Sequence, residues 1–160
     1  MYLDALSLLD DERDGWRPFE ALNDLSDDQL ERPIEALNGW RGRDLMAHLA
    51  ASQILALDVA KELAVNERSK TQAQFDAEWE QRGGDVINDE IGRDWGARPL
   101  TDVREAFMNV GGELRGFLTV VPESRWIKDA DNQRFLIDQT LDHYDEHRND
   151  LEAILAAAAS

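Results

Sequence analysis

Apolar residues recur at spacings of three and four positions through most of the chain, and no β-branched run alternates with a period of two for long. This periodicity is typical of amphipathic helices and not of strands. It predicts four long helices, over residues 2–22, 44–66 and 101–121 and from 131 to the alanine-rich end. Ser26 and Gln29 have the spacing of a capping box for a short helical turn between the first two. Thr101 is the expected N-cap of the third.

The stretch between the second and third long helices has a different pattern. Residues 72–98 show two shorter helical segments, at about 75–81 and 86–95, separated by the glycine pair Gly83–Gly84. Four long helices with one partly helical crossover predict an all-α four-helix bundle with antiparallel helices. A length of 160 residues suits one core, so we expect a single domain over residues 1–160.

Composition narrows the classes of function. The formal net charge of −17 disfavours nucleic acid and anionic membrane surfaces as partners. The chain contains no cysteine, which excludes thiolate nucleophiles, disulfides and cysteine metal sites and leaves His, Asp and Glu as the available ligands. The start of the chain has no signal-peptide pattern, and no apolar stretch is long enough to cross a bilayer. A cytoplasmic protein is therefore expected.

The only three histidines lie where helices are predicted. His143 and His147 are four positions apart, so they share a face that flanks the apolar stripe of the last helix. His48 lies at the edge of the stripe of the second helix. Two histidines at this spacing can bind one metal ion, as in the HExxH motif, but Tyr144 stands where that motif has glutamate. From spacing alone, a shared metal site and three unrelated side chains both stay open.

Two segments that contain these histidines resemble the DinB-like superfamily. NGWRGRDLMAHLAAS is similar to the start of its second helix, and HYDEHRNDL to its last helix. The resemblance implies an all-helical bundle in which His48, His143 and His147 bind a divalent metal, with zinc or nickel as first candidates and iron as another. One departure is Arg41-Gly42, where the family commonly has a Ser or Thr cap; a weaker helix start is expected there.

The segment VINDEIGRDWGARPLTDVREAF is similar to the ClbS/DfsB branch of this superfamily. The superfamily also includes the N-terminal domains of mycothiol-dependent maleylpyruvate isomerases. The resemblance therefore implies a low-molecular-weight thiol as a further cofactor candidate. Because its members carry out different reactions, fold alone does not select one.

Other side chains are candidates for the surroundings of the metal. Gln139 and Asp150 lie about one turn from the histidine pair, where either could orient an imidazole by a hydrogen bond. Solvated positions on the helix face are the alternative for both. The aromatic residues considered for a ligand pocket, with core packing as the alternative, are Trp40, Trp79, Trp95 and Tyr144.

Two functions from different classes follow. The first is a metal-dependent hydrolase or thiol transferase acting on a small electrophilic substrate, because the chain has no cysteine, no phosphate-binding glycine loop and no GxSxG serine. The second is a non-catalytic or metal-free bundle that sequesters a small molecule in self-resistance. The expected partners are a small molecule and, as a homodimer, a second copy of the chain.

Overall fold

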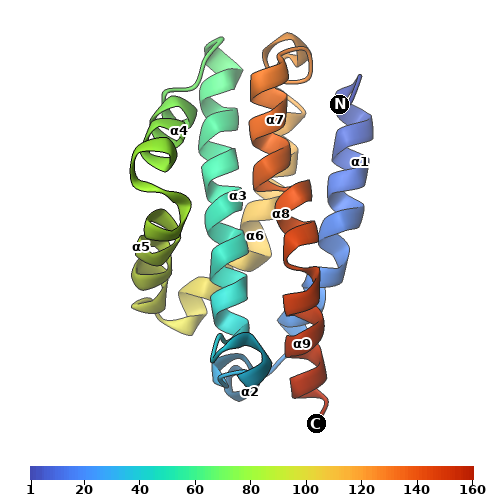
Figure 1. Cartoon of the computed structure of the whole chain (residues 1–160). Helices are drawn as coiled ribbons and strands as arrows, with labels where there is room; N and C mark the ends of the chain where they lie inside the picture. The colour runs from blue at the N-terminus through green and yellow to red at the C-terminus, as the bar shows by residue number, and fades with distance from the viewer.

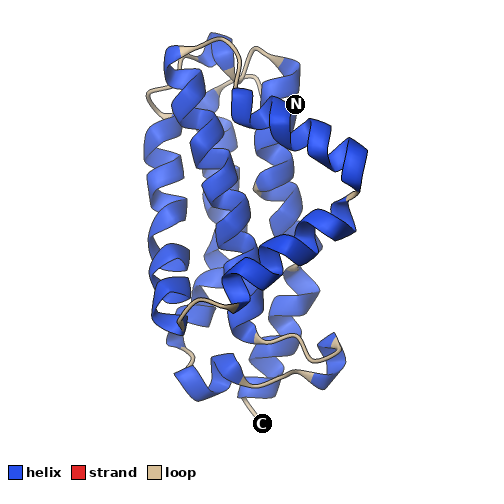
Figure 2. Cartoon of the chain, turned by 90° about the vertical axis from the view of Figure 1, so that its left-hand side faces the viewer, coloured by secondary structure: helices blue, strands red, loops and turns tan.

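The computed structural model describes residues 1–160 as helices joined by short connections, without strands (Figure 2). The α-helices are α1 (Ala5–Trp16), α2 (Asp27–Glu31), α3 (Gly42–Val65), α4 (Lys70–Arg82), α5 (Gly84–Gly96), α6 (Leu100–Leu118), α7 (Ala130–Gln139), α8 (Leu141–Glu146) and α9 (Arg148–Ala158). The 3₁₀ segments are η1 (Arg17–Asp24), η2 (Glu35–Leu37) and η3 (Glu123–Arg125). The predicted all-α fold is confirmed. No helix is both long and apolar enough to cross a membrane.

Four columns form the bundle: α1, α3, α6, and α7, α8 and α9 end to end (Figure 1). The crossover consists of α4 and α5, which together return the chain to the end of the bundle where α3 begins. As a result α3 and α6 run in the same direction, while α1 and the last column run in the opposite one. The predicted antiparallel arrangement is therefore wrong for α3 and α6, which run in parallel because the crossover spans the length of the bundle.

The helix ends differ from the predicted ones where local hydrogen bonding decides them. The first helix ends at Trp16, and a 3₁₀ segment with Pro18 near its start replaces the last part of the predicted helix, from Arg17 onward. The Ser26–Gln29 capping box is confirmed, with each residue's backbone N–H donating to the other's side chain. The third long helix begins after Pro99, so Thr101 is not its N-cap.

The last long helix is broken twice, which the sequence did not indicate. At Thr140 the backbone leaves the helical region, and the hydroxyl donates a 2.6 Å hydrogen bond to the carbonyl of Leu136. Such back-bonding to residue i−4 is known to bend helices. A second break falls at His147, whose backbone N–H bonds the carbonyl of Tyr144, three residues back, at 3.1 Å.

The start of α3 has no side-chain cap from Arg41, as expected. Asp44 takes over, because its carboxylate accepts hydrogen bonds from both the backbone N–H and the guanidinium of Arg41. An acidic group in the first turn also complements the helix dipole. The start of the helix that carries His48 is thereby fixed.

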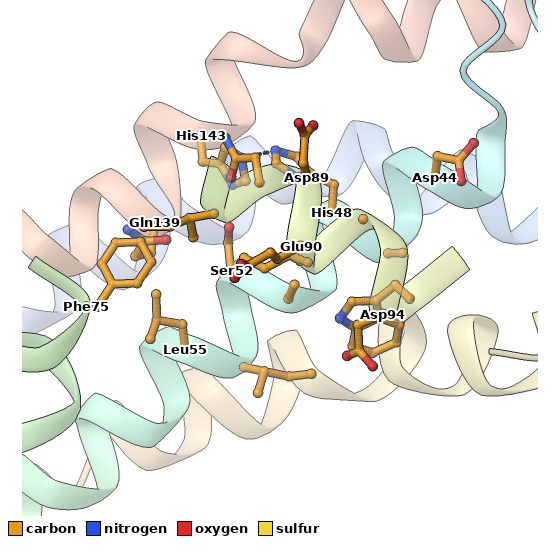
Figure 3. A pocket seen from close by; sticks show the side chains of 18 of the residues that line it. Asp44, His48, Ser52, Leu55, Phe75, Asp89, Glu90, Asp94, Gln139 and His143 are labelled. Carbon is orange, nitrogen blue, oxygen red and sulfur yellow. Dashed lines mark hydrogen bonds between the residues drawn. The ribbon is translucent and has the colours of Figure 1, made fainter. Parts of the chain in front are cut away.

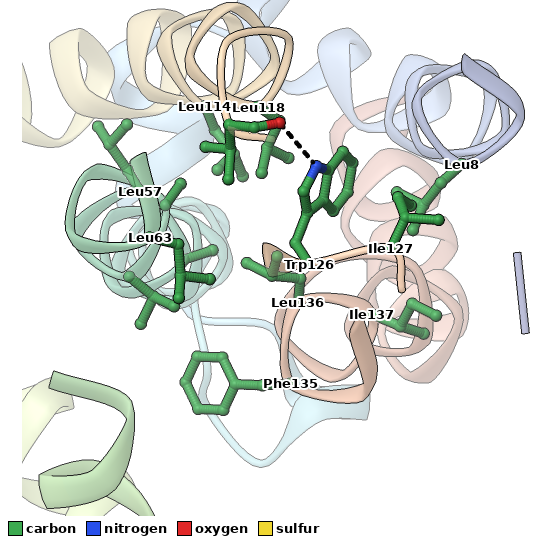
Figure 4. Close-up of a cluster of buried hydrophobic side chains, with 14 of the residues drawn as sticks. Leu8, Leu57, Leu63, Leu114, Leu118, Trp126, Ile127, Phe135, Leu136 and Ile137 are labelled. Carbon is green, nitrogen blue, oxygen red and sulfur yellow. Dashed lines mark hydrogen bonds between the residues drawn. The ribbon is translucent and has the colours of Figure 1, made fainter. Parts of the chain in front are cut away.

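The apolar interior consists of two clusters of buried side chains. One lies near the N-terminal end of α1 and includes Trp126, whose indole N–H donates to the carbonyl of Val121 at 3.2 Å (Figure 4). The other surrounds Trp16 and Phe107, whose ring centroids are 4.9 Å apart. On α1 the buried Glu12 falls between these clusters, and a polar layer forms at this level.

Four side chains make up this polar layer. Arg115 donates to both carboxylate oxygens of Glu12 at 3.0 and 3.1 Å. Tyr144 donates its hydroxyl hydrogen to Glu12 at 2.8 Å and accepts from the amide of Gln53 at 2.9 Å. Gly111 leaves the room for this layer, because a Cβ there would lie 3.2 Å from Nε2 of Gln53. The layer ties α1, α3, α6 and α8 together.

Candidate metal centre

The structure brings together the three histidines that the sequence singled out. His48 comes from α3, His143 from α8, and His147 from the break between α8 and α9. Each offers one ring nitrogen, and these nitrogens all lie within 4.8 Å of one another. The Nε2 atoms of His48 and His143 are 2.8 Å apart. Metal–nitrogen bonds are about 2.1 Å long, so one ion can contact all three after small adjustments.

Two of the imidazoles are neutral at physiological pH. Burial, with a contribution from His147, lowers the pKa of His48 to about 4. Burial, with contributions from His48 and His147, lowers the pKa of His143 to about 3. Metal ions bind the neutral imidazole, so burial favours the protonation state in which His48 and His143 can act as ligands. At 2.8 Å, one Nε2 must donate a hydrogen and the other must accept it.

Asp150 orients the third imidazole. The Nδ1 atom of His147 lies 2.7 Å from a carboxylate oxygen of Asp150, so Nδ1–H donates to the carboxylate. In the neutral ring, a hydrogen on Nδ1 leaves the lone pair on Nε2. A carboxylate that holds the remote nitrogen of a metal-binding histidine is common in zinc proteins. The structure thus places Asp150 where the sequence predicted, and the donor set of the three histidines fits a divalent ion.

A pocket of about 1270 Å³ opens beside the histidines, lined by α3, the crossover and the α7–α8 column (Figure 3). Three predicted tryptophans line it: Trp40, Trp79 and Trp95. The ring of Trp40 lies 5.8 Å from that of His48 and 5.9 Å from that of His147. Gln139 also lines the pocket, but it makes no hydrogen bond with an imidazole.

Tyr144 was predicted in this pocket and is instead in the core. Its side chain is 1% exposed and its hydroxyl bonds Glu12 and Gln53. The preceding residue on α8, His143, instead points toward His48 on α3. Successive helix positions differ by about 100°, so adjacent residues cannot both face the same pocket well. The prediction is wrong for Tyr144, which anchors α8 from behind.

Sequence reasoning missed the acidic character of the pocket wall. Nine of the lining residues are Asp or Glu, against two arginines. In Figure 3, Asp89, Glu90 and Asp94 lie along α5, and Asp44 lies on α3. The available signal was the high density of acids in residues 76–94, which reads equally well as a solvated face.

The protein is thus a helical bundle with a candidate metal site, in which histidines from two columns converge beside a large pocket. The family model described as mycothiol maleylpyruvate isomerase N-terminal domain matches residues 10–135. The chain belongs to this family, which has a DinB-like fold. The matched residues include His48 and end before His143. No curated protein and no solved structure matches the chain.

Proposed function

We propose that His48, His143 and His147 bind one divalent metal ion, and that the protein is a metal-dependent enzyme acting on a small electrophilic substrate. The observation that carries this proposal is the convergence of three imidazole nitrogens within 4.8 Å at the edge of a large pocket. Nitrogen ligands suit zinc or nickel first, with iron as a further candidate. The residues are held in place by α3 on one side and by α8 with its anchor Tyr144 on the other.

Three neutral protein ligands leave further coordination positions open, as in catalytic and not in structural metal sites. When bound, the ion supplies Lewis acidity to a group in an open position. The chain's own residues do the positioning. Asp150 fixes the ring of His147, and Trp40 packs beside two of the three imidazoles.

We favour hydrolysis or thiol transfer as the reaction. The family description names mycothiol, which is a low-molecular-weight thiol, and a chain without cysteine needs such a molecule if sulfur is the nucleophile. Ligand pockets commonly measure about 300–1,000 Å³. At about 1270 Å³ this pocket offers room for a thiol and a second small molecule together.

A non-catalytic function is the second candidate. The same pocket would allow a metal-free bundle to sequester a reactive small molecule in self-resistance. With either candidate function, we further propose that the chain belongs to the ClbS/DfsB branch, that it is cytoplasmic and that it forms a homodimer.

Metal content separates the two candidates. We expect protein purified without a histidine tag to contain about one zinc, nickel or iron ion per chain by mass spectrometry. His147→Ala should lose this ion, while circular dichroism keeps the helical signal. Gln139→Ala is the matched control, because Gln139 lines the pocket without a hydrogen bond to an imidazole, and it should keep the ion. If wild-type protein is purified without metal and binds neither zinc nor nickel at micromolar concentration, the metal-dependent enzyme is wrong. The sequestering function is then the remaining candidate.

A further inference from the structure

The pocket is lined by more acidic than basic side chains, and only some of the acidic ones form ion pairs. Both arginines of the wall are already paired: Arg43 with Glu31 at 2.7 Å, and Arg98 with Asp94 at 2.6 Å. An anionic ligand would therefore meet guanidinium groups whose charge a carboxylate already balances, and it would gain less from them than from an unpaired arginine.

Four carboxylates of the wall have no arginine or lysine partner. They are Asp76, Glu78, Asp89 and Glu146. Asp76 and Glu78 come from α4, Asp89 from α5 and Glu146 from α8, so these charges surround the space from three helices. Partial burial, followed by the charges of Asp138 and Asp131, raises the pKa of Asp76. This direction is expected where negative charge lacks a counterion.

Aromatic rings line the same space. Trp79 is 43% exposed, and Trp40 and Phe75 also line the pocket. The faces of such rings attract cations, most strongly for tryptophan. The wall already contains one example, because the guanidinium of Arg98 lies 3.9 Å from the ring centroid of Trp95. Carboxylates and partly exposed aromatic rings together are the chemistry that recognises an organic ammonium group.

We propose, on the basis of the proposed function, that the small molecule taken up by this pocket is cationic: an amine or quaternary ammonium compound whose charged end lies among the unpaired carboxylates of α4, α5 and α8. Its reactive end then faces the histidines. The large negative charge of the whole chain adds a general attraction for cations, so the test must separate the pocket from the surface.

Three probes of similar size make that separation in metal-free protein: benzyltrimethylammonium, benzyl alcohol and benzenesulfonate. Binding is followed by tryptophan fluorescence and by calorimetry. We expect the ammonium probe to bind at least about tenfold more tightly than the other two, and to weaken as salt rises because exposed charges are screened. Equal or tighter binding of the sulfonate, or no measurable binding of the ammonium probe, overturns the proposal.

Matched double variants locate the effect. Asp76→Asn with Asp89→Asn removes two unpaired pocket charges, and the dissociation constant for the ammonium probe should rise on the order of tenfold. Glu105→Gln with Glu152→Gln removes two exposed charges outside the pocket and should change it less than about twofold. Equal weakening by both pairs would show a general charge effect and overturn the proposal. Because the probes bind without metal, failure of metal loading and failure of this inference are separate results.

Discussion

The hydroxyl of Tyr144 offers a sharp test of the polar layer behind the metal centre. The chain has two tyrosines, and each donates its hydroxyl hydrogen to a carboxylate: Tyr144 to Glu12 at 2.8 Å, and Tyr2 to Asp11 at 2.7 Å. The first pair is buried and the second is exposed. The same substitution at the two positions therefore isolates burial as the variable.

Tyr144→Phe removes two buried hydrogen bonds, to Glu12 and from Gln53. Glu12 keeps Arg115, but the amide nitrogen of Gln53 is left without a partner, and its amide oxygen already has none. An unsatisfied buried donor costs about 1–3 kcal/mol, and a net hydrogen bond contributes about 1 kcal/mol. We expect the free energy of unfolding to fall by roughly 2–4 kcal/mol. In Tyr2→Phe water replaces the lost partner, and the loss should stay below about 0.5 kcal/mol.

Urea denaturation of chelator-treated protein measures both variants without a contribution from bound metal. The m-value should not change, and the melting temperature of Tyr144→Phe should fall by several degrees. Adding Gln53→Leu to Tyr144→Phe should cost less than the sum of the single changes, because the orphaned amide is removed with it. If Tyr144→Phe is no more destabilised than Tyr2→Phe, the polar layer does not hold α8 in place.

Three further predictions concern the metal centre and its support. Asp150→Asn should weaken metal binding about 10- to 100-fold with the helical signal unchanged, as measured by competition with a chromogenic chelator. The metal-free protein should lose stability as pH falls from 6.5 towards 5. His48 and His143 have lowered pKa values in the folded protein, so the unfolded state binds more protons in this pH range. Urea titrations at several pH values should show that the free energy of unfolding falls by roughly 1–2 kcal/mol per pH unit. A free energy of unfolding that does not fall would contradict the buried neutral imidazoles. Gly42→Ala should destabilise the fold by about 1–3 kcal/mol in the same titration, since its Cβ would lie 2.9 Å from a methyl carbon of Leu30, whereas Gly92→Ala, with open space around it, should not.

The helices could be predicted from the sequence because helical periodicity is a local property. The glycine pair Gly83–Gly84 marked the junction between α4 and α5, and Ser26 with Gln29 marked the start of α2. The parallel course of α3 and α6 could not be predicted in this way. It depends on how far the crossover extends along the bundle, which the spacing of apolar residues does not reveal.

The candidate site was only partly visible in the sequence. Histidines are rare in this chain and four-residue spacing is conspicuous, so the three imidazoles stood out. The carboxylate of Glu12 lies 103 positions from its partner Arg115, and a single sequence contains no sign of such a pairing. Tyr144 faces the core because its hydroxyl donates to this same Glu12. Because the sequence does not reveal that contact, Tyr144 was predicted on the pocket side of α8.

The break at His147 is part of the site and not an irregularity next to it. His147 ends α8 and is also the N-cap of α9, because its carbonyl accepts the N–H of Leu151 at 3.0 Å. Asp150 then occupies the first turn of α9, where a carboxylate is favoured by the helix dipole, and it reaches back to Nδ1 of His147. One acidic residue thus stabilises the start of a helix and fixes the tautomer of a metal-ligand candidate. The short sequence HRND carries both functions, since the histidine sits at the cap and the aspartate three positions later. A helix that continued without a break would still place two histidines on one face, but the N-terminus that favours Asp150 would be absent.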